Sequence, residues 1–426
     1  MATPEEVEES EWQKLPSQLQ HQFYELADGE ADKHAALLNR LRKKFESLKA
    51  LLEPYFKEVP NESWEGLRVA VVDGSFSPVM DTRLLGRYGV YCAGYHIYEG
   101  AELVDEGSFT SGVVFRPNEE YGRVSRAIIA LLTALEERRM ALSCAKRSDV
   151  DYVVVDGSFF GFVRDCIVLK RSQAEVEGFD SPSELVKALT NTTKELLDTG
   201  KAVGVIKRVR LRAIDGWLLV RNAREVETAR DYKSCFQKAC EVMTGAIDKA
   251  ILSMIMTPST WFSYSDLLEN EPAWAYRYYS HLAMWYPMRV RGNQRPLKVS
   301  AVLEEAKRGR KRGLIEAFGE EVFELVSEGL ERHYIKANEE APACCIEAPK
   351  GMDLGPILAY CTAFSNEDTG HPFPLDLIDD DVTLPRLFTR EFVEEVEARL
   401  LERSGLDLEA VRRMFAYLNP QKKWRA

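Results

Sequence analysis

A six-residue sequence, VVDGSF, occurs twice in this 426-residue chain, at positions 71–76 and 154–159. Each copy closes a short apolar run that has the length and composition of a buried strand. An aspartate therefore ends each strand and is followed by a glycine, which permits a tight turn. Because ligands bind at the strand ends of α/β sheets, the repeat predicts two carboxylates, Asp73 and Asp156, side by side at one edge of a sheet.

Strand and helix patterns alternate around the repeat. Apolar and β-branched runs predict the following strands: 67–72, 88–98, 101–105, 112–116, 151–155, 203–209 and 216–220. Helical spacing predicts helices at these positions: 32–52, 120–147, 183–199, 224–255, 300–337 and 388–416. The stretch 366–381, rich in glycine, proline and acidic residues, is expected to be a loop. Together these patterns favour an α/β fold, a mixed sheet flanked by helices with added helical regions.

The chain is too long for one compact core, so we expect several parts. We assign residues 1–60 to an N-terminal helical extension and 61–260 to the sheet-containing core. Residues 261–345 are expected to form an aromatic and basic helical insertion, and 346–426 to complete the core domain.

Charge and cysteine content narrow the class of protein. The net charge of −12 argues against a chain coated with basic side chains, but suits one that gathers carboxylates around metal ions. The eight cysteines include no C-x-x-C pair, so we expect free thiols rather than disulfides or zinc. With no secretory signal and no membrane-spanning apolar run, the expected location is the cytoplasm.

Two adjacent carboxylates repel each other unless a cation lies between them. Hard oxygen ligands favour Mg²⁺ or Mn²⁺, and two such ions about 4 Å apart can support phosphodiester cleavage. The alternative is that Asp-Gly-Ser is only a turn sequence. Aspartic proteases also have two short Asp motifs, but in the order Asp-Thr/Ser-Gly, which differs from the order here.

A third carboxylate is expected from the helix between the two copies. Glu136 and Glu137 both follow its apolar stripe, and the spacing leaves open which of them faces the site and whether either does.

This pattern resembles the NurA nuclease family, whose fold is similar to that of RNase H and Piwi nuclease domains. The two Asp-Gly-Ser strand ends and the acidic helix carry most of the resemblance. The strand 203–208, with Lys207 near its end, and the sequences 372–375 (PFPL) and 377–379 (LID) match further family motifs.

The resemblance implies a metal-dependent DNA nuclease with single-strand endonuclease and 5′-to-3′ exonuclease activity, Mn²⁺ (or Mg²⁺) as cofactor, and a role in DNA end processing, repair or defence. It also implies a homodimer that works with a hexameric HerA-type ATPase. The implied catalytic residues are Asp73, Glu136, Glu137, Asp156 and Lys207, and Asp379 joins the four carboxylates as a metal ligand.

One position departs from the family. Its C-terminal motif supplies a histidine, and Asp379 stands at the matching place here. Aspartate can bind a metal but cannot act as a neutral imidazole base. His371, before the proline motif, is expected to be a loop residue. The departure leaves a second hypothesis open, a weakly active or inactive NurA-like adaptor that binds and regulates a translocase.

Basic residues near the motifs are candidates for DNA contacts: Arg83, Arg87, Lys207 and Arg210. The basic run 307–312 could follow a DNA backbone or be a solvated helix end, and the aromatic stretch 261–286 could stack on bases or form core. No P-loop sequence is present, so we expect no ATP hydrolysis by this chain itself.

Overall fold

The computed structural model describes residues 14–118, 120–403 and 407–418. Contacts within the chain divide it into two units, Met1–Pro54 and Tyr55–Ala426. In the first unit, α1 (Ser17–Leu52) is one long helix, which confirms the helix expected at 32–52 and extends it toward the N-terminus. A 3₁₀ turn, η1 (Glu53–Tyr55), follows it.

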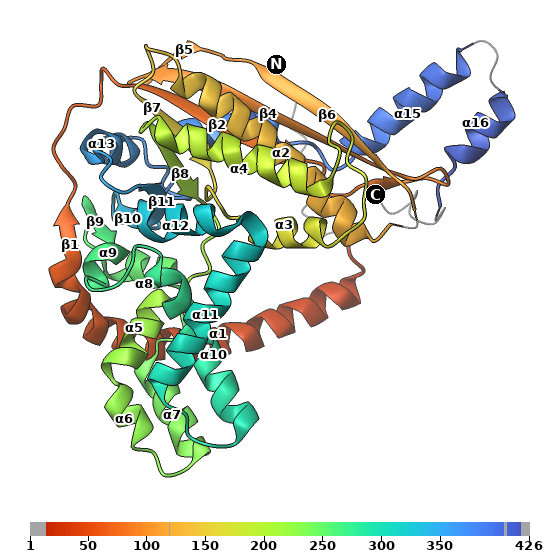
Figure 1. The fold of residues 1–426 in the computed structure, drawn as a ribbon. Coiled ribbons are helices and arrows are strands. Elements are labelled where there is room, and N and C mark those ends of the chain that lie inside the picture. The colour runs from red at the N-terminus through yellow and green to blue at the C-terminus, as the bar shows by residue number, and fades with distance from the viewer. Residues whose placement is uncertain (1–13, 119, 404–406, 419–426) are drawn as a thin grey trace, which may run out of the picture. The chain divides into compact units, whose positions relative to one another are not determined.

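The second unit is built on one mixed sheet, which has eleven strands among the residues described (Figure 1). The strands are β1 (Phe56–Glu58), β2 (Arg68–Phe76), β3 (Asp81–Thr82), β4 (Arg87–Glu99), β5 (Glu102–Asp105), β6 (Phe109–Arg116), β7 (Tyr152–Asp156), β8 (Ala202–Ile206), β9 (Thr260–Ser263), β10 (Leu330–Lys336) and β11 (Cys344–Pro349). Their order is β1-β9-β10-β11-β8-β7-β2-β4-β3, with β5 and β6 also paired to β4.

The centre of the sheet is parallel and carries both copies of the repeat. β2 lies beside β7, β7 lies beside β8, and both pairs are parallel. Val72 pairs with Val155, so the next residues along the two strands, Asp73 and Asp156, are neighbours. The expectation that the two aspartates lie side by side on adjacent strands is therefore confirmed, although only Asp156 ends its strand, because β2 continues to Phe76.

Helices cover both faces of this sheet. Alternate residues of the central strands pack against α13 (Gly355–Ala363) and α14 (Phe373–Val382) on one face. The other face carries α2 (Gly122–Ala145), α3 (Val163–Lys170) and α4 (Pro182–Asp198). In Figure 1, α2 and α4 lie across the strands. The predicted α/β class, with a mixed sheet flanked by helices, is correct.

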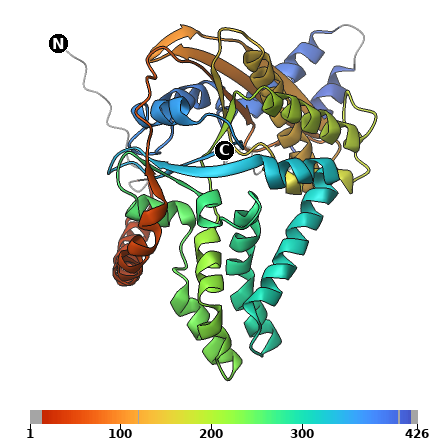
Figure 2. The ribbon, with the colours of Figure 1, turned by 60° about the vertical axis from the view of Figure 1, so that its left-hand side comes forward.

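A group of helices within the second unit extends away from the sheet (Figure 2). Its core joins side chains of α5 (Ala213–Arg221), α6 (Ala223–Glu227), α7 (Tyr232–Val242), α10 (Ala275–Asn293) and α11 (Val299–Phe318). The remaining helices are α8 (Asp248–Ile255), α9 (Tyr264–Leu267), α12 (Glu320–Gly329), α15 (Phe388–Leu401) and α16 (Leu408–Met414).

Several predicted elements differ from the structure. The apolar run 216–220 is helix α5, not a strand, because α10 packs closely on it: a Cβ on Gly216 would lie 2.1 Å from the Tyr279 carbonyl oxygen. The single helix expected at 224–255 is three helices. Asp231 caps the start of α7 by accepting hydrogen bonds from two backbone N–H groups, and Gly245, with φ +85°, separates α7 from α8.

The region 261–345 is not only helical. It supplies β9 and β10, which continue the sheet between β1 and β11, so the helix expected at 300–337 ends before β10 begins at Leu330. The expected loop at 366–381 holds α14 from Phe373 onward. Within the described ranges, no helix is both long enough and apolar enough to cross a bilayer.

Candidate active site

Three carboxylates from separate elements surround one ammonium group. Lys207 Nζ lies 2.6 Å from Asp379 Oδ2, 3.4 Å from Asp156 Oδ2 and 3.9 Å from Asp73 Oδ2. Asp73 is 3% exposed, whereas the side chains of Asp156 and Asp379 are 25% and 45% exposed. The cluster is therefore buried on the β2 side and reaches solvent on the α14 side.

Strand alternation explains why these groups meet. Side chains two residues before Asp73, Asp156 and Lys207 belong to the core shared with α13 and α14. With a two-residue period, the three polar side chains point to that same face. Lys207 comes directly after β8, which ends at Ile206, so the strand expected at 203–209 is shorter than predicted.

A fourth carboxylate, Glu137, reaches the cluster from the opposite face. α2 packs there, and a Cβ built on Gly74 would lie 3.3 Å from Glu137 Oε2 and 3.1 Å from Thr133 Cγ2. The glycine of the first Asp-Gly-Ser copy thus leaves room for Glu137 against the end of β2. Glu137 forms an ion pair with buried Arg138.

Glu136 takes no part in this cluster. Its carboxylate pairs with Arg139 at 2.6 Å on a more exposed part of α2. The structure thus brings Asp73, Glu137 and Asp156 together, and it leaves Glu136 outside.

Burial and mutual repulsion make these carboxylates hard to ionise. Burial raises the pKa of Asp73 well above its ordinary range, and the charges of Asp156 and Glu137 raise it further. Burial also raises the pKa of Glu137 to about 7, although Arg138 opposes the shift. The pKa of Asp156 is raised by burial as well, against the opposing effect of Lys207.

Lys207 and Asp379 behave in the opposite way. Burial alone would raise the pKa of Asp379, but the hydrogen bond and charge of Lys207 outweigh it and the pKa is lowered. The pKa of Lys207 is raised, because Asp156, Asp379 and Asp73 together outweigh the effect of burial. This pair is ionised at neutral pH, while Asp73 and Glu137 tend to hold protons.

His371 was expected to be an ordinary loop residue, but it is buried and lies close enough to Lys207 and Asp379 for their charges to affect it. Burial and the charges of Lys249 and Lys207 lower its pKa to about 3. Lys249 Nζ lies 3.3 Å from His371 Nε2. Because an ammonium can only donate, Nε2 accepts and the proton of the neutral ring is on Nδ1. No short motif marks Lys249, whose place depends on α8 packing near the site.

The predicted DNA-contacting arginines occupy different environments. Arg83 is buried: it binds Asp81 and donates to the Phe415 carbonyl and to Tyr417 Oη. Arg87 donates to the backbone carbonyls of Pro117 and Asn118, whereas Arg210 is exposed.

The structure also bears on the predictions for the aromatic stretch and for the cysteines. Five tyrosines of the 261–286 stretch are buried: Tyr264, Tyr276, Tyr278, Tyr279 and Tyr286. They form core rather than a surface for stacking bases. All eight cysteines lie within the described residues, and none of them forms a disulfide.

The donor set has the chemistry of a hard divalent ion, although the arrangement seen is not a ready-made metal site. Within the ranges that the structure describes, no three His, Cys, Asp or Glu side chains are placed to hold an ion together. Instead, Lys207 lies among three of the carboxylates and Arg138 pairs with Glu137. Four carboxyl groups with two paired cations leave an excess of negative charge, and the raised pKa values of Asp73 and Glu137 reflect it.

Comparison with known proteins agrees with this arrangement. The family model described as the NurA domain matches residues 43–382, a span that includes all four carboxylates and Lys207. The chain belongs to the NurA family. A search of the curated proteins returns no match.

One solved NurA structure shares the fold at low sequence identity, and a second is given for comparison. The NurA nuclease from Sulfolobus solfataricus is 12% identical, with 92% of this chain and 100% of that chain covered and a TM-score of 0.52. A crystal structure of NurA bound to dAMP and manganese is also 12% identical, covering 89% of this chain and 97% of that chain, with a TM-score of 0.46.

Proposed function

We propose that this protein is a metal-dependent DNA nuclease of the NurA type. The observation that carries the proposal is the cluster of Asp73, Asp156 and Asp379 around Lys207, with Glu137 entering from the opposite face of the sheet. Membership of the family, and the nuclease function of the solved relative, support it.

The residues that would hold Mn²⁺ or Mg²⁺ are Asp73, Glu137, Asp156 and Asp379. Their oxygen donors suit these hard ions. A divalent ion would ease the repulsion that now raises the pKa of Asp73 and Glu137. In phosphodiester hydrolysis such an ion lowers the pKa of water and stabilises charge on phosphate oxygens. The dAMP and manganese in one solved NurA structure favour this ligand class for the family.

Lys207 has a second role in this proposal. Its ammonium neutralises the carboxylates while no other cation is present, at 2.6–3.9 Å from three of them. A mobile point charge in that place can bind a non-bridging oxygen of the scissile phosphate once the carboxylates have another partner. Arg138 keeps Glu137 oriented and its second Nη atom reaches the Ser158 carbonyl at 3.4 Å.

The specific nuclease activities and the partners of the protein are part of the same proposal. Single-strand endonuclease and 5′-to-3′ exonuclease activity, a homodimer, and action with a hexameric HerA-type ATPase in DNA end processing, repair or defence follow from the family.

A second candidate is a NurA-like adaptor that regulates a translocase without cleaving DNA. One observation favours it: Lys207 already supplies a cation to three carboxylates, so that part of the cluster can be satisfied without a metal. Asp379 in place of the family histidine points the same way.

The two candidates separate in one assay. Purified protein is incubated with end-labelled single-stranded DNA in Mn²⁺, in Mg²⁺ or in chelator. A nuclease degrades the strand in Mn²⁺ and leaves it intact in chelator. Intact DNA under every divalent ion, with retained binding to a translocase, would establish the adaptor instead.

A further inference from the structure

A second polar cluster lies beside the end of β7, on the opposite face of the sheet from the aspartates. Ser158, two residues after Asp156, donates a hydrogen bond to Glu347 Oε1 of β11 at 2.8 Å. Ile346 and Ala348 point into the α13–α14 core, so Glu347 between them points to the other face. Arg332 of β10 donates to Glu347 Oε2 at 2.8 Å and to Ser158 Oγ at 3.0 Å.

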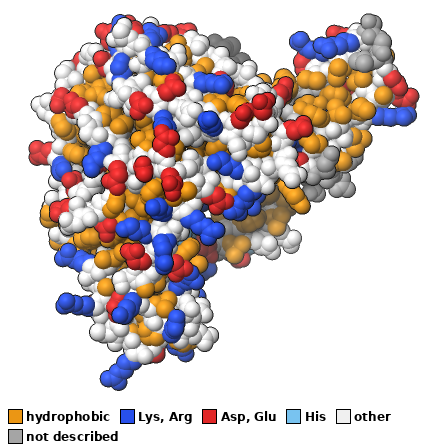
Figure 3. Space-filling model, viewed as in Figure 1, with side chains coloured by type: hydrophobic (Ala, Val, Ile, Leu, Met, Phe, Trp, Pro, Cys, Tyr) orange, Lys and Arg blue, Asp and Glu red, His pale blue; other side chains and the backbone are white. Residues whose placement is uncertain are grey.

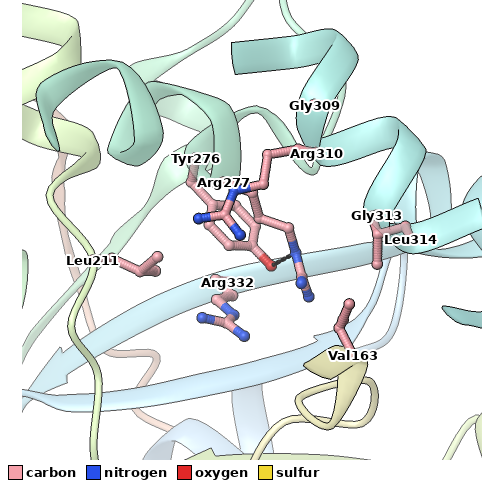
Figure 4. Close-up of a pocket in the computed structure, with 9 residues that line it drawn as sticks. All are labelled: Val163, Leu211, Tyr276, Arg277, Gly309, Arg310, Gly313, Leu314 and Arg332. Atoms are coloured by element: carbon pink, nitrogen blue, oxygen red, sulfur yellow. Dashed lines mark hydrogen bonds between the residues drawn. The ribbon is translucent and has the colours of Figure 1, made fainter. Parts of the chain in front are cut away.

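A cavity of about 160 Å³ opens over this cluster (Figure 4). We call it the arginine cavity. Its lining residues come from α3, α10, α11, β10 and the segment between β8 and α5: Val163, Leu211, Tyr276, Arg277, Gly309, Arg310, Gly313, Leu314 and Arg332. The space is large enough for several water molecules or for one phosphate group.

The positive charge of the arginine cavity exceeds its negative charge. Three guanidinium groups, from Arg277, Arg310 and Arg332, line it. Glu347 pairs with Arg332 and Arg277; it is fully buried, and its lowered pKa shows that these two arginines outweigh the effect of burial. One carboxylate cannot neutralise three guanidinium groups.

One buried donor shows that the excess charge is not fully satisfied within the protein. Arg277 Nη2 is buried without a hydrogen-bond partner among the described residues, and it stands 3.7 Å from Glu347 Oε2. Arg310 is the most solvent-exposed of the three arginines. Its pKa is lowered by loss of solvent and by the positive charge of Arg277. A buried donor without a partner is costly unless a ligand or water supplies the acceptor.

Packing does not explain why the part of α11 that lines the cavity carries two glycines. Gly309 and Gly313 are one helical turn apart in the middle of α11, and both line the cavity. A Cβ on either would meet no atom within 4 Å, and neither has a positive φ. Glycine destabilises a helix interior, so glycine at these two positions leaves space in the cavity at the expense of helix stability.

We propose that the arginine cavity binds a phosphate group. Guanidinium groups present N–H donors in a planar fork that matches phosphate oxygens, and buried Arg277 Nη2 still lacks such an acceptor. The phosphate belongs to a DNA strand or to a free nucleotide. Its assignment to DNA rests on the proposed nuclease function, whereas the phosphate site itself does not.

The basic residues of the run 307–312 that do not line the arginine cavity provide a matched comparison. Lys307 and Lys311 lie over the rings of Tyr278 and Phe323, at 5.5 and 5.0 Å. Arg308 and Arg312 are exposed on the same helix, where Lys and Arg side chains gather on the surface around α11 in Figure 3. Arg308, Lys311 and Arg312 line a shallow surface apart from the arginine cavity.

The test measures phosphate binding in chelator, where the carboxylate site holds no metal and no cleavage occurs. Inorganic phosphate is titrated calorimetrically into the full chain and into the Arg310→Gln and Gly313→Leu variants, with Arg308→Gln as the control. Gly313→Leu fills the cavity from a position where a side chain has room. Circular dichroism and thermal unfolding confirm that each variant folds.

We expect at least tenfold weaker phosphate binding in both cavity variants and unchanged binding in Arg308→Gln. Absence of binding to the native chain, or equal loss in the control, would overturn the proposal. Oligonucleotide binding then identifies the source of the phosphate. Weaker binding of single-stranded DNA by Arg310→Gln, with a salt slope reduced by about one, assigns it to a strand. Unchanged DNA binding with lost phosphate and dAMP binding assigns it to a free nucleotide.

Discussion

The carboxylate cluster and the arginine cavity lie on opposite faces of one sheet, near the end of β7, and they have opposite charge imbalances. Asp156 belongs to the first, and Ser158, two residues later, belongs to the second. In the carboxylate cluster the pKa of Asp73 and that of Glu137 are raised, so bound protons reduce the negative charge of the cluster. In the arginine cavity the pKa of Glu347 is lowered, and a guanidinium donor lacks an acceptor.

This contrast shows that a buried charge has to be judged with its partners. Glu137 and Glu347 are both buried glutamates paired with a neighbouring arginine. The pKa of Glu137 is raised by burial and further by Asp156, whereas that of Glu347 is lowered because two arginines outweigh burial. Removing the charge should therefore have opposite effects on stability at the two sites.

The largest effect is expected on catalysis at the carboxylate cluster. Asp73→Asn and Asp156→Asn should each reduce Mn²⁺-dependent DNA degradation by about 10³-fold or more, since each removes a charged oxygen donor from the site. Asparagine at 73 can still accept the hydrogen bond from the Gly74 backbone N–H. Single-turnover cleavage of labelled single-stranded DNA measures the loss. Glu136→Gln, on the same helix as Glu137 but outside the cluster, is the matched control.

The next effect is a loss of stability at the arginine cavity. Glu347→Gln leaves Arg332 and Arg277 without their buried counter-charge, which should cost about 3–5 kcal/mol in the free energy of unfolding. Urea denaturation at pH 7 measures it. A change below about 1 kcal/mol would show that Glu347 does not hold these arginines, and the contrast between the two sites would fail.

Glu137→Gln should do the opposite and stabilise the metal-free protein. The folded-state pKa of about 7 lies above the ordinary value, so protonated Glu137 contributes stability that is present at low pH and lost as the pH rises through 7. At pH 8 in chelator the variant should be more stable by on the order of 1–3 kcal/mol, and the difference should vanish near pH 4. Thermal unfolding across this range checks the sign. A variant less stable than the native chain at pH 8 would contradict it.

The smallest effect concerns the glycine-lined wall of α11. Gly313→Ala should stabilise the protein by about 0.5–1 kcal/mol, because its Cβ enters open space in a helix. Gly216→Ala is the contrasting variant: its Cβ would meet the Tyr279 carbonyl, so it should be destabilising. Equal effects of the two variants in chemical denaturation would remove the argument that the wall of α11 is left open for a ligand.

The central sheet could be predicted because its signal is local. Five-to-nine-residue apolar strands that end in Asp-Gly-Ser specify both their burial and their chemistry, and the prediction that Asp73 and Asp156 are neighbours was correct. The prediction of a strand at 216–220 failed because its local signal is ambiguous. A short apolar segment can be a strand or a buried helix, and the packing of α10 decides between them.

The rest of the candidate site depends on packing that no short pattern records. Glu136 and Glu137 are adjacent in sequence, and only the orientation of α2 relative to Gly74 decides which of the two carboxylates reaches the cluster. Asp379 was identified through the family motif, although the helix that presents it was expected to be a loop. Arg277, Arg310 and Arg332 come from three different elements, α10, α11 and β10, so their common cavity has no sequence signature.

The most direct test of the account is Mn²⁺ binding followed by the loss of the free-ion signal in electron paramagnetic resonance. The native chain should bind Mn²⁺ more tightly as the pH rises through 7, when Glu137 gives up its proton. Asp73→Asn and Asp156→Asn should weaken binding at least tenfold, while Glu136→Gln should not. Equal Mn²⁺ binding by the native chain and both aspartate variants would contradict the claim that these strand ends form a metal site.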